Sequence, residues 1–312
     1  MKVLVTGGGG FIGSHVAEAY RDAGHQVVVV DALIGGRQNN APTGVTFYCV
    51  DIRQRDLEDV FRQERPDVVS HHAAQANVRH SLADPVRDAE HNVHGTLRVL
   101  ECSRLNNVRQ IIFSSTAGAL YGEPERLPVT EDDPVRPTSP YGFHKYLAEQ
   151  YFEYYRRNYG LNTTIFRYGN VYGPRQDPQT EAGVIAIFTE QFLTGRTPVV
   201  FGDGRQVRDF VYVADVADAN LRALGQEVDV PLHIGSGVGT SVLDLAGRLR
   251  TMTEAPIPWT HGAAVPGEVG RIVLSVERAA RVLNWRPKVS LEQGLRRTVG
   301  WFVAKRQGDR DP

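Results

Sequence analysis

Tyr141 and Lys145 are the residues whose types and spacing most directly suggest chemistry. On a helix, a spacing of four residues places both side chains on one face, so we expect them to meet. A free phenol has a pKa of about 10 and is a poor base at neutral pH. A lysine ammonium one turn away favours the phenolate. We therefore expect Lys145 to lower the pKa of Tyr141 towards neutral pH.

A glycine-rich segment near the N-terminus predicts a dinucleotide site. Residues 6–13 read Thr-Gly-Gly-Gly-Gly-Phe-Ile-Gly, between an apolar run at 2–6 and a helical pattern at 11–23. Gly7, Gly10 and Gly13 let the backbone approach a pyrophosphate, and the helix N-terminus supplies N–H groups and positive potential. Taken alone, the pattern is equally compatible with a glycine turn that binds nothing.

Two carboxylates strengthen the dinucleotide interpretation. Asp31 ends the second apolar run, 18 residues after Gly13, where an acid accepts hydrogen bonds from an adenosine ribose. It would repel a 2′-phosphate, which favours NAD over NADP. Asp51 and Ile52 end the next run and are placed to meet adenine. Each aspartate could instead be a simple loop cap, but all three features follow successive strands, so the sequence predicts bound NAD.

The sequence His71-His72-Ala73-Ala74 follows the fourth strand. Adjacent strand residues point to opposite faces, so the two histidines cannot chelate one metal together, and we predict no metal site. Ala73 and Ala74 are small enough to allow a cofactor to approach the backbone.

Composition limits the function classes. The chain has 312 residues, which suits one large or two modest domains, and 41% hydrophobic and 23% charged residues are ordinary for a globular protein. A net charge of −1 gives no electrostatic case for nucleic acid or membrane as the main partner. Cys49 and Cys102 are too few for a disulfide framework, and we expect buried free thiols. The start reads as neither a signal peptide nor a membrane span, so we expect a cytoplasmic protein.

Short apolar runs alternate with helical patterns in the first half of the chain. Runs at 2–6, 27–30, 45–50, 67–71, 110–113 and 163–167 are separated by helical segments at about 11–23, 56–64, 86–106 and 140–159, with Pro85 and Pro140 suited to first helical turns and Ser139 to a cap. This alternation predicts an α/β fold with a Rossmann-type doubly wound parallel sheet. The rhythm breaks after residue 168. We therefore expect an NAD-binding domain at 1–168, joined by a returning segment near 209–224, and a smaller substrate-binding lobe at 169–312.

Taken together, these segments resemble the extended short-chain dehydrogenase/reductase family of nucleotide-sugar epimerases and dehydratases. The resemblance is carried in order by TGGGGFIG, Asp31, Asp51-Ile52, HHAAQ, Asn92, FSSTAGALYG, YGFHK, RYGNVYGPRQ and RDFVYVADVADA, and by NWRPKVSL at 284–291. The resemblance covers nearly the whole chain. Within the family, the chain is most similar to the members that epimerise UDP-hexoses. The resemblance implies reversible C4 epimerisation of UDP-glucose and UDP-galactose through a 4-keto sugar, with tightly bound NAD.

The resemblance also assigns roles to residues. It implies that Tyr141 exchanges the proton of the sugar 4-hydroxyl, that Lys145 stabilises the phenolate and holds the nicotinamide ribose, and that Thr116 bridges Tyr141 and the 4-oxygen. The cofactor-binding residues are then Gly7, Gly10, Phe11, Ile12, Gly13, Asp31, Asp51, Ile52, Ala73, Ala74, Asn92, Ser114, Tyr141, Lys145 and Tyr168. Asn92 is expected to tie its helix to the neighbouring strand.

For the UDP side of the pocket, the resemblance implies the residues Thr116, Asn170, Val184, Val199, Phe201, Arg208, Glu268, Arg271 and Ile272. Arg208 would pair with phosphate, although a surface ion pair with Asp209 is the alternative. The family usually shows Arg-Pro-Gly-Asp where this chain has Val265-Pro266-Gly267-Glu268, so Arg271 is a candidate to replace the missing arginine. Ile272 occupies a position that screens N-acetyl sugars; its intermediate size implies some tolerance of UDP-GlcNAc.

Individual residues argue for or against other functions that share this fold. A 4,6-dehydratase needs an Asp-Glu pair directly after the threonine, where this chain has Ala117 and Gly118. A 4-epimerase of UDP-GlcNAc or of UDP-glucuronate stays open, because Arg175 or another arginine could meet a carboxylate. A non-catalytic NAD-binding regulator would commonly lose Tyr141 or Lys145. The resemblance further implies a homodimer formed through the helices at about 86–106 and 140–159.

Overall fold

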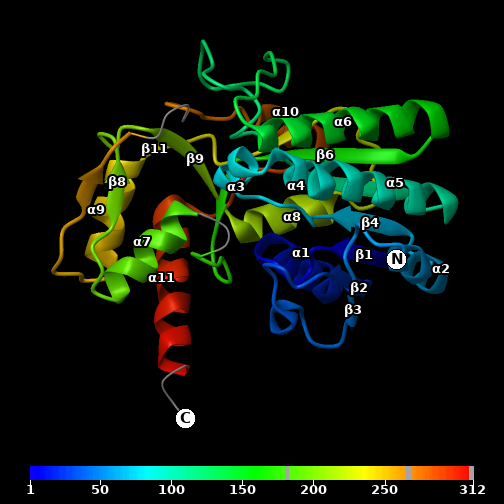
Figure 1. The fold of residues 1–312 in the computed structure, drawn as a ribbon, viewed down its shortest axis with the longest axis horizontal. Coiled ribbons are helices and arrows are strands. Elements are labelled where there is room, and N and C mark those ends of the chain that lie inside the picture. The colour runs from blue at the N-terminus through cyan, green and yellow to red at the C-terminus, as the bar shows by residue number, and fades with distance from the viewer. Residues whose placement is uncertain (180–182, 265–268, 309–312) are drawn as a thin grey trace.

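The structure is a computed structural model that describes residues 1–179, 183–264 and 269–308. Its larger lobe is built on a seven-stranded sheet in the order β10-β6-β5-β4-β1-β2-β3, and every neighbouring pair is parallel (Figure 1). The strands are β1 (Lys2–Thr6), β2 (Gln26–Asp31), β3 (Thr46–Cys49), β4 (Val68–His71), β5 (Gln110–Thr116), β6 (Asn162–Tyr168) and β10 (Leu232–Ile234). This order confirms the predicted doubly wound Rossmann-type fold.

Helices cover both faces of this sheet because alternate strand residues point to opposite sides. Val3 and Val5 share a buried cluster with residues of α1 (Phe11–Asp22) and α8 (Val213–Ala223). Leu4, between them, belongs to a second cluster formed with α2 (Asp56–Glu64), α5 (Thr96–Leu105) and α6 (Pro140–Tyr159). The apolar runs recognised in the sequence are thus buried on both faces.

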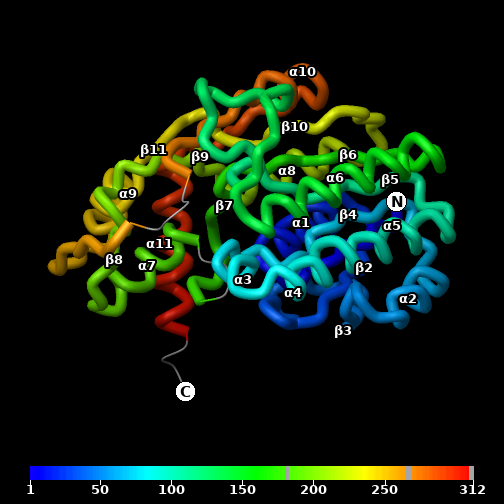
Figure 2. Tube along the Cα trace, turned by 45° about the horizontal axis from the view of Figure 1, so that its top comes forward, coloured from blue at the N-terminus to red at the C-terminus, as the bar shows by residue number. Residues whose placement is uncertain are grey.

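The predicted helices are found with one difference. Ser139 caps α6 by accepting from the Gly142 amide at 3.2 Å, and Pro140 occupies its first turn, as expected. The single helix expected at 86–106 is instead α4 (Pro85–Ala89), the π-helical segment η2 (Glu90–Gly95) and α5. Such π-helical turns widen the hydrogen-bond ladder and are frequent at functional sites. Here η2 carries Asn92. The short helix α3 (Val78–Ala83) precedes α4, and α3, α4 and α5 all pack along α6 (Figures 1 and 2).

The smaller lobe has its own core. It contains two small sheets, β11-β9-β7 and β12-β8, with strands β7 (Asn170–Tyr172), β8 (Val199–Phe201), β9 (Val207–Tyr212), β11 (Gly239–Ser241) and β12 (Thr260–Gly262). Helices α7 (Val184–Leu193), α9 (Val242–Met252) and α11 (Leu291–Gly308) bury a third cluster against them. Since α8 packs on α1 and β10 joins the large sheet, the chain returns to the larger lobe after entering the smaller one.

A long loop, helix α10 (Glu277–Leu283) and a short turn complete the larger lobe. The loop between β5 and α6 reaches α10, where Arg278 pairs with Glu131 and Asp132 (Figure 2). The 3-10 turn η1 (Gln38–Asn40) follows β2.

The expectation of two buried thiols is wrong for Cys49, which is exposed because it ends the edge strand β3, whereas Cys102 is buried. Among the residues described, no helix combines the length and apolar character that crossing a membrane requires.

Candidate active site

The glycine loop lies where β1 meets α1 and is shaped for close backbone approach. Gly7 has φ +71°, and a Cβ there would lie 2.6 Å from the amide nitrogen of Ala73. Gly10 is the N-cap of α1 and offers no side chain to cap its first turn. The first-turn N–H groups therefore keep their capacity to bind an anion, supported by the helix dipole. This loop fits the pyrophosphate of a dinucleotide.

Asp31 closes the same loop from the end of β2. Its carboxylate is buried and accepts hydrogen bonds from the amides of Gly9 at 2.9 Å and Leu33 at 2.8 Å. An ionised carboxylate has about four acceptor positions, so two are left for ribose hydroxyls. The ribose contact remains a prediction, and the geometry leaves the acceptors it needs.

Asp51 and Ile52 lie at the end of β3 as expected, with a competing partner. The Arg53 guanidinium contacts the Asp51 carboxylate at 2.6 Å, and the Arg53 amide donates to it at 2.9 Å. These hydrogen bonds hold the pKa of Asp51 below its usual value. The loop-cap role considered as the alternative is therefore present. Ile52 is buried beneath Gly95, whose added Cβ would meet the Ile52 side chain.

The two histidines at the end of β4 are enclosed and hydrogen-bonded to hydroxyls. His71 lies between the hydroxyls of Thr6 at 2.7 Å and Thr96 at 3.0 Å, and His72 contacts Ser70 at 2.9 Å. Burial lowers the pKa of both rings, that of His72 to about 3, so both are neutral. Nowhere in the described part of the chain do three metal-ligating side chains gather.

Asn92 joins η2 to the loop after β4. Its amide accepts from the Gln75 amide at 3.0 Å and donates to the Gln75 carbonyl at 2.9 Å. The side chain is almost fully buried. The tie between helix and strand expected for Asn92 is therefore present. The segment it holds contains Ala73, half-buried, and Ala74, exposed, next to the glycine loop.

Thr116, Tyr141 and Lys145 come together at the C-terminal edge of the sheet. Thr116 ends β5 and forms a side-chain hydrogen bond with Tyr141, which lies in the first turn of α6. Lys145 is 4% exposed and its Nζ lies 4.4 Å from the centroid of the Phe113 ring. Because β1, β4 and β5 are parallel and in register, this edge is also the edge that carries the glycine loop. The expected catalytic trio thus lies beside the dinucleotide loop.

The expected direction of the Tyr141 pKa is wrong in this structure. Burial raises the pKa of Tyr141 above its usual value, the nearby Asp88 carboxylate raises it further, and the bond to Thr116 offsets only part of the change. Lys145 is itself desolvated: burial lowers its pKa to about 8, although Glu149 and Asp88 act in the opposite direction. The causes of the Tyr141 shift are therefore burial, Asp88 and Thr116.

The residues expected near the nicotinamide and sugar lie around the same edge. Tyr168 ends β6; its ring is packed in the core, and its hydroxyl accepts from Asn220 at 2.8 Å and is hydrogen-bonded to Ser114. Asn170 begins β7, and its Oδ1 would lie 3.6 Å from a Cβ at Gly118, two residues after Thr116. Asn170 therefore faces the loop that follows the catalytic strand. The contacts of both residues with ligand remain predictions.

The residues expected at the uracil end belong to the smaller lobe. Val184 begins α7, and Val199 and Phe201 flank the buried Val200 in β8 with their side chains exposed. The guanidinium of Arg79, from α3 of the larger lobe, lies 5.0 Å from the centroid of the Phe201 ring. The two lobes therefore meet at Phe201, and Arg79 is a neighbour of this end of the pocket that the sequence did not reveal.

The phosphate-side candidates lie on or beside β9. Arg208 donates to the carbonyls of Val207 at 3.0 Å and Gly270 at 3.4 Å. Asp209 is buried and accepts instead from the amides of Ser236, Gly237 and Leu274. The surface-pair alternative is therefore wrong.

Arg271 and Ile272 lie in the segment that runs beside the start of β9. Arg271 pairs with Val207 in a parallel bridge, so it points to the face opposite Arg208, which counts against it as the replacement cation. Ile272 is 2% exposed and packs with Ala117, the residue after Thr116. Val265 and Glu268 lie outside the described residues.

Asp88, Arg37 and Lys305 are groups near the site that the sequence analysis did not identify. Asp88 of α4 is 1% exposed and bonded to His144 of α6; His144 stands inside the YGFHK motif, whereas nothing in the local sequence marks Asp88. Arg37, Arg175 and Lys305 line a pocket of about 460 Å³ beside Phe11. Arg175 pairs there with Glu18 and donates to the Asn40 carbonyl at 3.1 Å.

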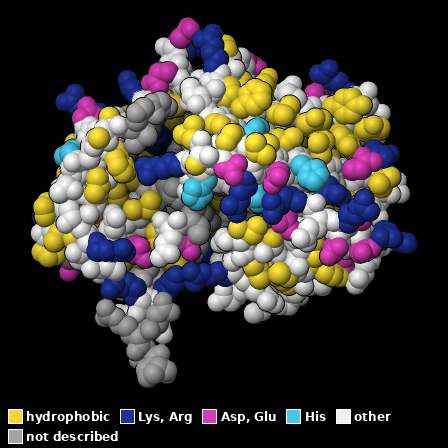
Figure 3. Space-filling model, viewed as in Figure 1, with side chains coloured by type: hydrophobic (Ala, Val, Ile, Leu, Met, Phe, Trp, Pro, Cys, Tyr) yellow, Lys and Arg dark blue, Asp and Glu magenta, His cyan; other side chains and the backbone are white. Residues whose placement is uncertain are grey.

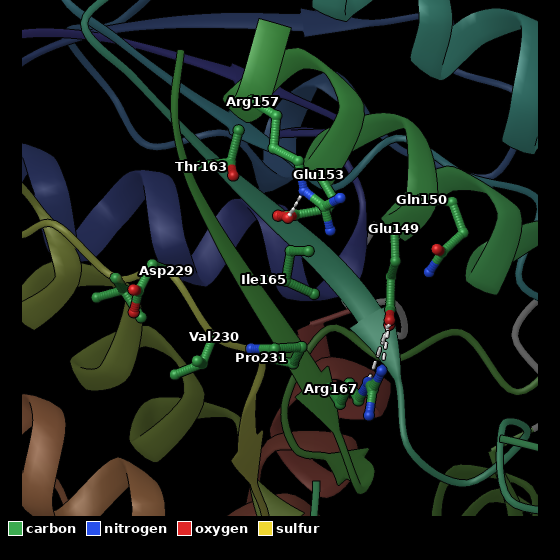
Figure 4. Close-up of a pocket in the computed structure, with 11 residues that line it drawn as sticks. Glu149, Gln150, Glu153, Arg157, Thr163, Ile165, Arg167, Asp229, Val230 and Pro231 are labelled. Carbon is green, nitrogen blue, oxygen red and sulfur yellow. Dashed lines mark hydrogen bonds and ion pairs between the residues drawn. The ribbon is translucent and has the colours of Figure 1, made fainter. Parts of the chain in front are cut away.

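A second pocket lies behind the catalytic helix. It measures about 280 Å³ and is lined by residues of α6, β6 and the segment 228–231 (Figure 4). At its inner end Arg167 binds Glu149 through both Nε and Nη2, at 3.1 and 2.7 Å (Figure 4). Glu149 also accepts from Ser115. Ser115 therefore has a structural role, because it ties β5 to α6 through Glu149.

Comparison with known proteins gives one family. The family model described as "NAD dependent epimerase/dehydratase family" matches residues 3–235. A crystal structure of UDP-glucose 4-epimerase with UDP-glucose from Thermotoga maritima is 45% identical with a TM-score of 0.96, covering 98% of this chain and 99% of that one. The Thermus thermophilus UDP-glucose 4-epimerase complex with NAD is 43% identical with a TM-score of 0.93, covering 97% and 99%. A protein named putative UDP-glucose 4-epimerase from Methanocaldococcus jannaschii is 44% identical over 96% of this chain and 98% of its own.

Proposed function

This chain belongs to the NAD dependent epimerase/dehydratase family, and we propose that it catalyses the reversible C4 epimerisation of UDP-glucose and UDP-galactose with bound NAD. The observation that carries the proposal is the placement of Thr116, Tyr141 and Lys145 beside the glycine loop at one sheet edge. Relatives that are 43% and 45% identical over nearly their whole length, named for this activity, support the substrate class.

The chain's own residues divide the work of the reaction. Tyr141, as phenolate, removes the proton from the sugar 4-hydroxyl and later returns it, and Thr116 holds the 4-oxygen beside the phenol. Bound NAD supplies the acceptor, and then the donor, of the hydride at C4. The 4-keto sugar turns between the two transfers, so it receives hydrogen on its other face. Lys145 holds the nicotinamide ribose and keeps a positive charge near the phenolate.

We propose the same cofactor contacts that the sequence predicts. The glycine loop and the first turn of α1 would hold the pyrophosphate, Asp31 the adenosine ribose, and Ile52 with Asp51 the adenine. Since NAD is regenerated in every cycle, it stays with the protein. We therefore expect purified protein to convert UDP-galactose without added NAD.

Residue details favour a neutral hexose over the alternatives. Ala117 is buried and no carboxylate follows Thr116, so the chain lacks the acid–base pair of a dehydratase. Arg175, the candidate partner for a glucuronate carboxylate, is bound by Glu18 instead. The intermediate size of the Ile272 side chain supports some turnover of UDP-GlcNAc.

The decisive experiment compares epimerisation by the parent protein and by Tyr141→Phe. Purified protein is incubated with UDP-galactose, UDP-GlcNAc and UDP-glucuronate without added NAD, and the C4 epimer of each is measured. We expect UDP-glucose to accumulate from UDP-galactose and the Tyr141→Phe variant to lose most of the rate. Equal rates for both proteins would refute the catalytic role of Tyr141, and no turnover of any sugar would refute the enzyme.

We also propose that the chain forms a homodimer through α6 and the helices beside it. The exposed apolar side chains of this surface are Val78, Leu82, Val86, Leu105, Phe143, Tyr154 and Tyr159. Hydrophobic side chains gather over these helices on the face shown in Figure 3. Apolar patches of this kind mark association surfaces. Light scattering should give a dimer mass, and Val86→Asp, which places a charge on a side chain 70% exposed, should give a monomer.

A further inference from the structure

Glu123 joins the loop that follows β5 to the segment carrying Ile272. Both of its carboxylate oxygens accept from the Gly270 amide, at 3.1 and 2.7 Å. Hydrogen bonds to an ionised carboxylate are roughly twice as strong as bonds between neutral groups. A Cβ at position 270 would lie 2.6 Å from Oε1 of Glu123, so a larger residue there would push the carboxylate away. Glu123 therefore anchors the first residue of the linking segment (residues 270–275).

The loop presents Glu123 from a fixed base. Gly122 has φ +58°, and a Cβ there would lie 2.6 Å from the Arg136 carbonyl oxygen, so the chain makes a turn that glycine adopts without strain. The neighbouring Tyr121 is buried, and its hydroxyl accepts from Arg167 of β6 at 2.7 Å. Glu123 is thus mounted on the sheet that carries the catalytic strand β5.

The linking segment lies between this loop and the smaller lobe. On the loop side, the Val129 amide donates to the Val273 carbonyl at 2.7 Å, and the Ser275 amide donates to the Val129 carbonyl at 2.7 Å. On the other side, the Ile272 amide donates to the Val207 carbonyl of β9 at 3.0 Å. The segment therefore connects the loop after the catalytic strand with a strand of the smaller lobe through backbone hydrogen bonds.

The carbonyl of Gly270 meets a residue proposed to bind substrate. It accepts from the Val207 amide at 2.9 Å and from Nη1 of Arg208 at 3.4 Å. Arg208 is the guanidinium expected to pair with the UDP diphosphate. Glu123 holds the N–H of the same glycine, so a shift of Gly270 also moves the carbonyl that contacts Arg208. The position of this cation therefore depends on Glu123.

Ile272 lies close to the same anchor along the chain. It is 2% exposed and packs in a cluster with Ala117 and Val129. Ala117 directly follows Thr116, so Ile272 lies on the side of the site where the hexose is expected. Two residues of extended chain span only about 7 Å, so the anchored Gly270 restricts where the Ile272 side chain can lie.

We propose that Glu123 is a positioning residue for the UDP-sugar. By fixing Gly270 it orients Arg208 towards the diphosphate, and through the linking segment it places Ile272 beside the hexose. Arg208 then supplies binding energy and Ile272 supplies selectivity between sugars, while Glu123 acts through the backbone. This inference deepens the proposed function and rests on it, because it assigns the residue that orients the substrate-binding groups of that same site.

The test compares substrate binding and turnover in the holoenzyme. Glu123→Gln keeps the size of the side chain and one acceptor oxygen but removes the charge, and Glu123→Ala removes both acceptors. Glu125→Gln and Glu125→Ala are the matched controls, since Glu125 lies on the same loop, is 87% exposed and pairs with Arg136 at 3.6 Å. Calorimetry measures the binding of UDP and of uridine. Kinetic assays give kcat and KM for UDP-galactose and UDP-GlcNAc.

We expect Glu123→Ala to weaken UDP binding and to raise the KM for UDP-galactose by about fivefold, with Glu123→Gln intermediate. The affinity for uridine should stay within about twofold of the parent value, because uridine has no diphosphate for Arg208 to bind. The kcat for UDP-galactose should change little, since Tyr141 is untouched. The kcat/KM ratio of UDP-GlcNAc to UDP-galactose should rise, because Ile272 is less firmly placed. Both Glu125 variants should match the parent protein in every measurement.

Three results would overturn the inference. Unchanged UDP affinity and KM in Glu123→Ala would show that Gly270 needs no anchor. An equal loss of UDP and uridine affinity would mean that the whole pocket has loosened, and a fall in kcat with an unchanged KM would place the effect on the chemical step. An unchanged preference between the two sugars would overturn the part assigned to Ile272.

UDP binding can be measured without turnover, so this inference and the proposed function can fail separately. Weaker UDP binding with unchanged uridine binding supports the positioning role of Glu123 even if no UDP-hexose is epimerised, and the missing turnover would then overturn only the proposed function. If Glu123→Ala fails to fold, as judged by circular dichroism, Glu123→Gln decides by the same measurements.

Discussion

Replacing Lys145 with methionine should stabilise the protein from which NAD has been removed. Burial lowers the pKa of Lys145 from its ordinary 10.5 to about 8. Since each pKa unit is worth about 1.4 kcal/mol, keeping this ammonium charged inside the fold costs about 3 kcal/mol. Methionine fills a similar volume against the Phe113 ring and carries no charge. The variant should therefore gain about 2 to 3 kcal/mol of unfolding free energy at pH 7.

The sign of the pH dependence follows from which state holds the proton. Between pH 8 and 10.5 the unfolded chain keeps the Lys145 proton that the folded chain releases. The stability of the parent protein, measured against Lys145→Met, therefore rises with pH across this window. The advantage of the variant should be full below pH 8 and fade towards pH 10.5.

Thermal unfolding of both proteins at pH 7 and near pH 10 measures the effect. Lys305→Met is the control, since Lys305 is exposed over the Trp301 ring and its loss should change little at either pH. A Lys145→Met protein less stable than the parent at pH 7, or an advantage that is the same at both pH values, would refute the argument. With NAD bound, the stability advantage of Lys145→Met over the parent should shrink or reverse, because only the parent gains the contact between Lys145 and the nicotinamide ribose.

Three further outcomes follow from the site. Arg167→Met should cost about 3 to 5 kcal/mol in chemical denaturation, because Glu149 stays buried without its cation, while Arg167→Met with Glu149→Gln should recover most of that loss. Asp31→Asn should lower the NAD retained on purification, measured from nucleotide released on denaturation, because the amide presents an N–H group towards the Gly9 amide. Ile272→Gly should raise the kcat/KM ratio of UDP-GlcNAc to UDP-galactose; an unchanged ratio would show that Ile272 does not border the hexose.

Much of the fold could be predicted because the apolar runs are local signals. The expected bounds of α2 and α6 match the structure, and Ser139 caps α6 as its position before Pro140 suggested. The split at η2 could not be seen, since a π-helical turn has no distinct residue pattern and depends on how Asn92 is held. The return of β10 to the large sheet was also hidden, because a three-residue strand carries no readable period.

The site was predictable in position and less so in electrostatics. Spacing paired Tyr141 with Lys145, and the family resemblance added Thr116. The three lie together because strand ends and helix starts converge at one sheet edge. The direction of the Tyr141 pKa was wrong because it depends on burial and on Asp88, which is distant in sequence. The local sequence does not show which charges tertiary packing buries near a site. A motif can therefore identify the reacting groups but not their pKa values.

Two of the segments that carry the family resemblance, RDFVYVADVADA and NWRPKVSL, have a packing role in the structure. Asp215, from RDFVYVADVADA, accepts from the amides of Lys288 and Val289, and its own carbonyl accepts from the Trp285 indole at 3.0 Å. The NWRPKVSL segment is thereby fixed to α8, which packs against α1 directly behind the glycine loop. None of these residues touches the catalytic trio in the described structure. The two motifs hold the smaller lobe against the first helix of the dinucleotide site, so their substitution should alter cofactor retention and lobe position before it alters the proton chemistry of Tyr141.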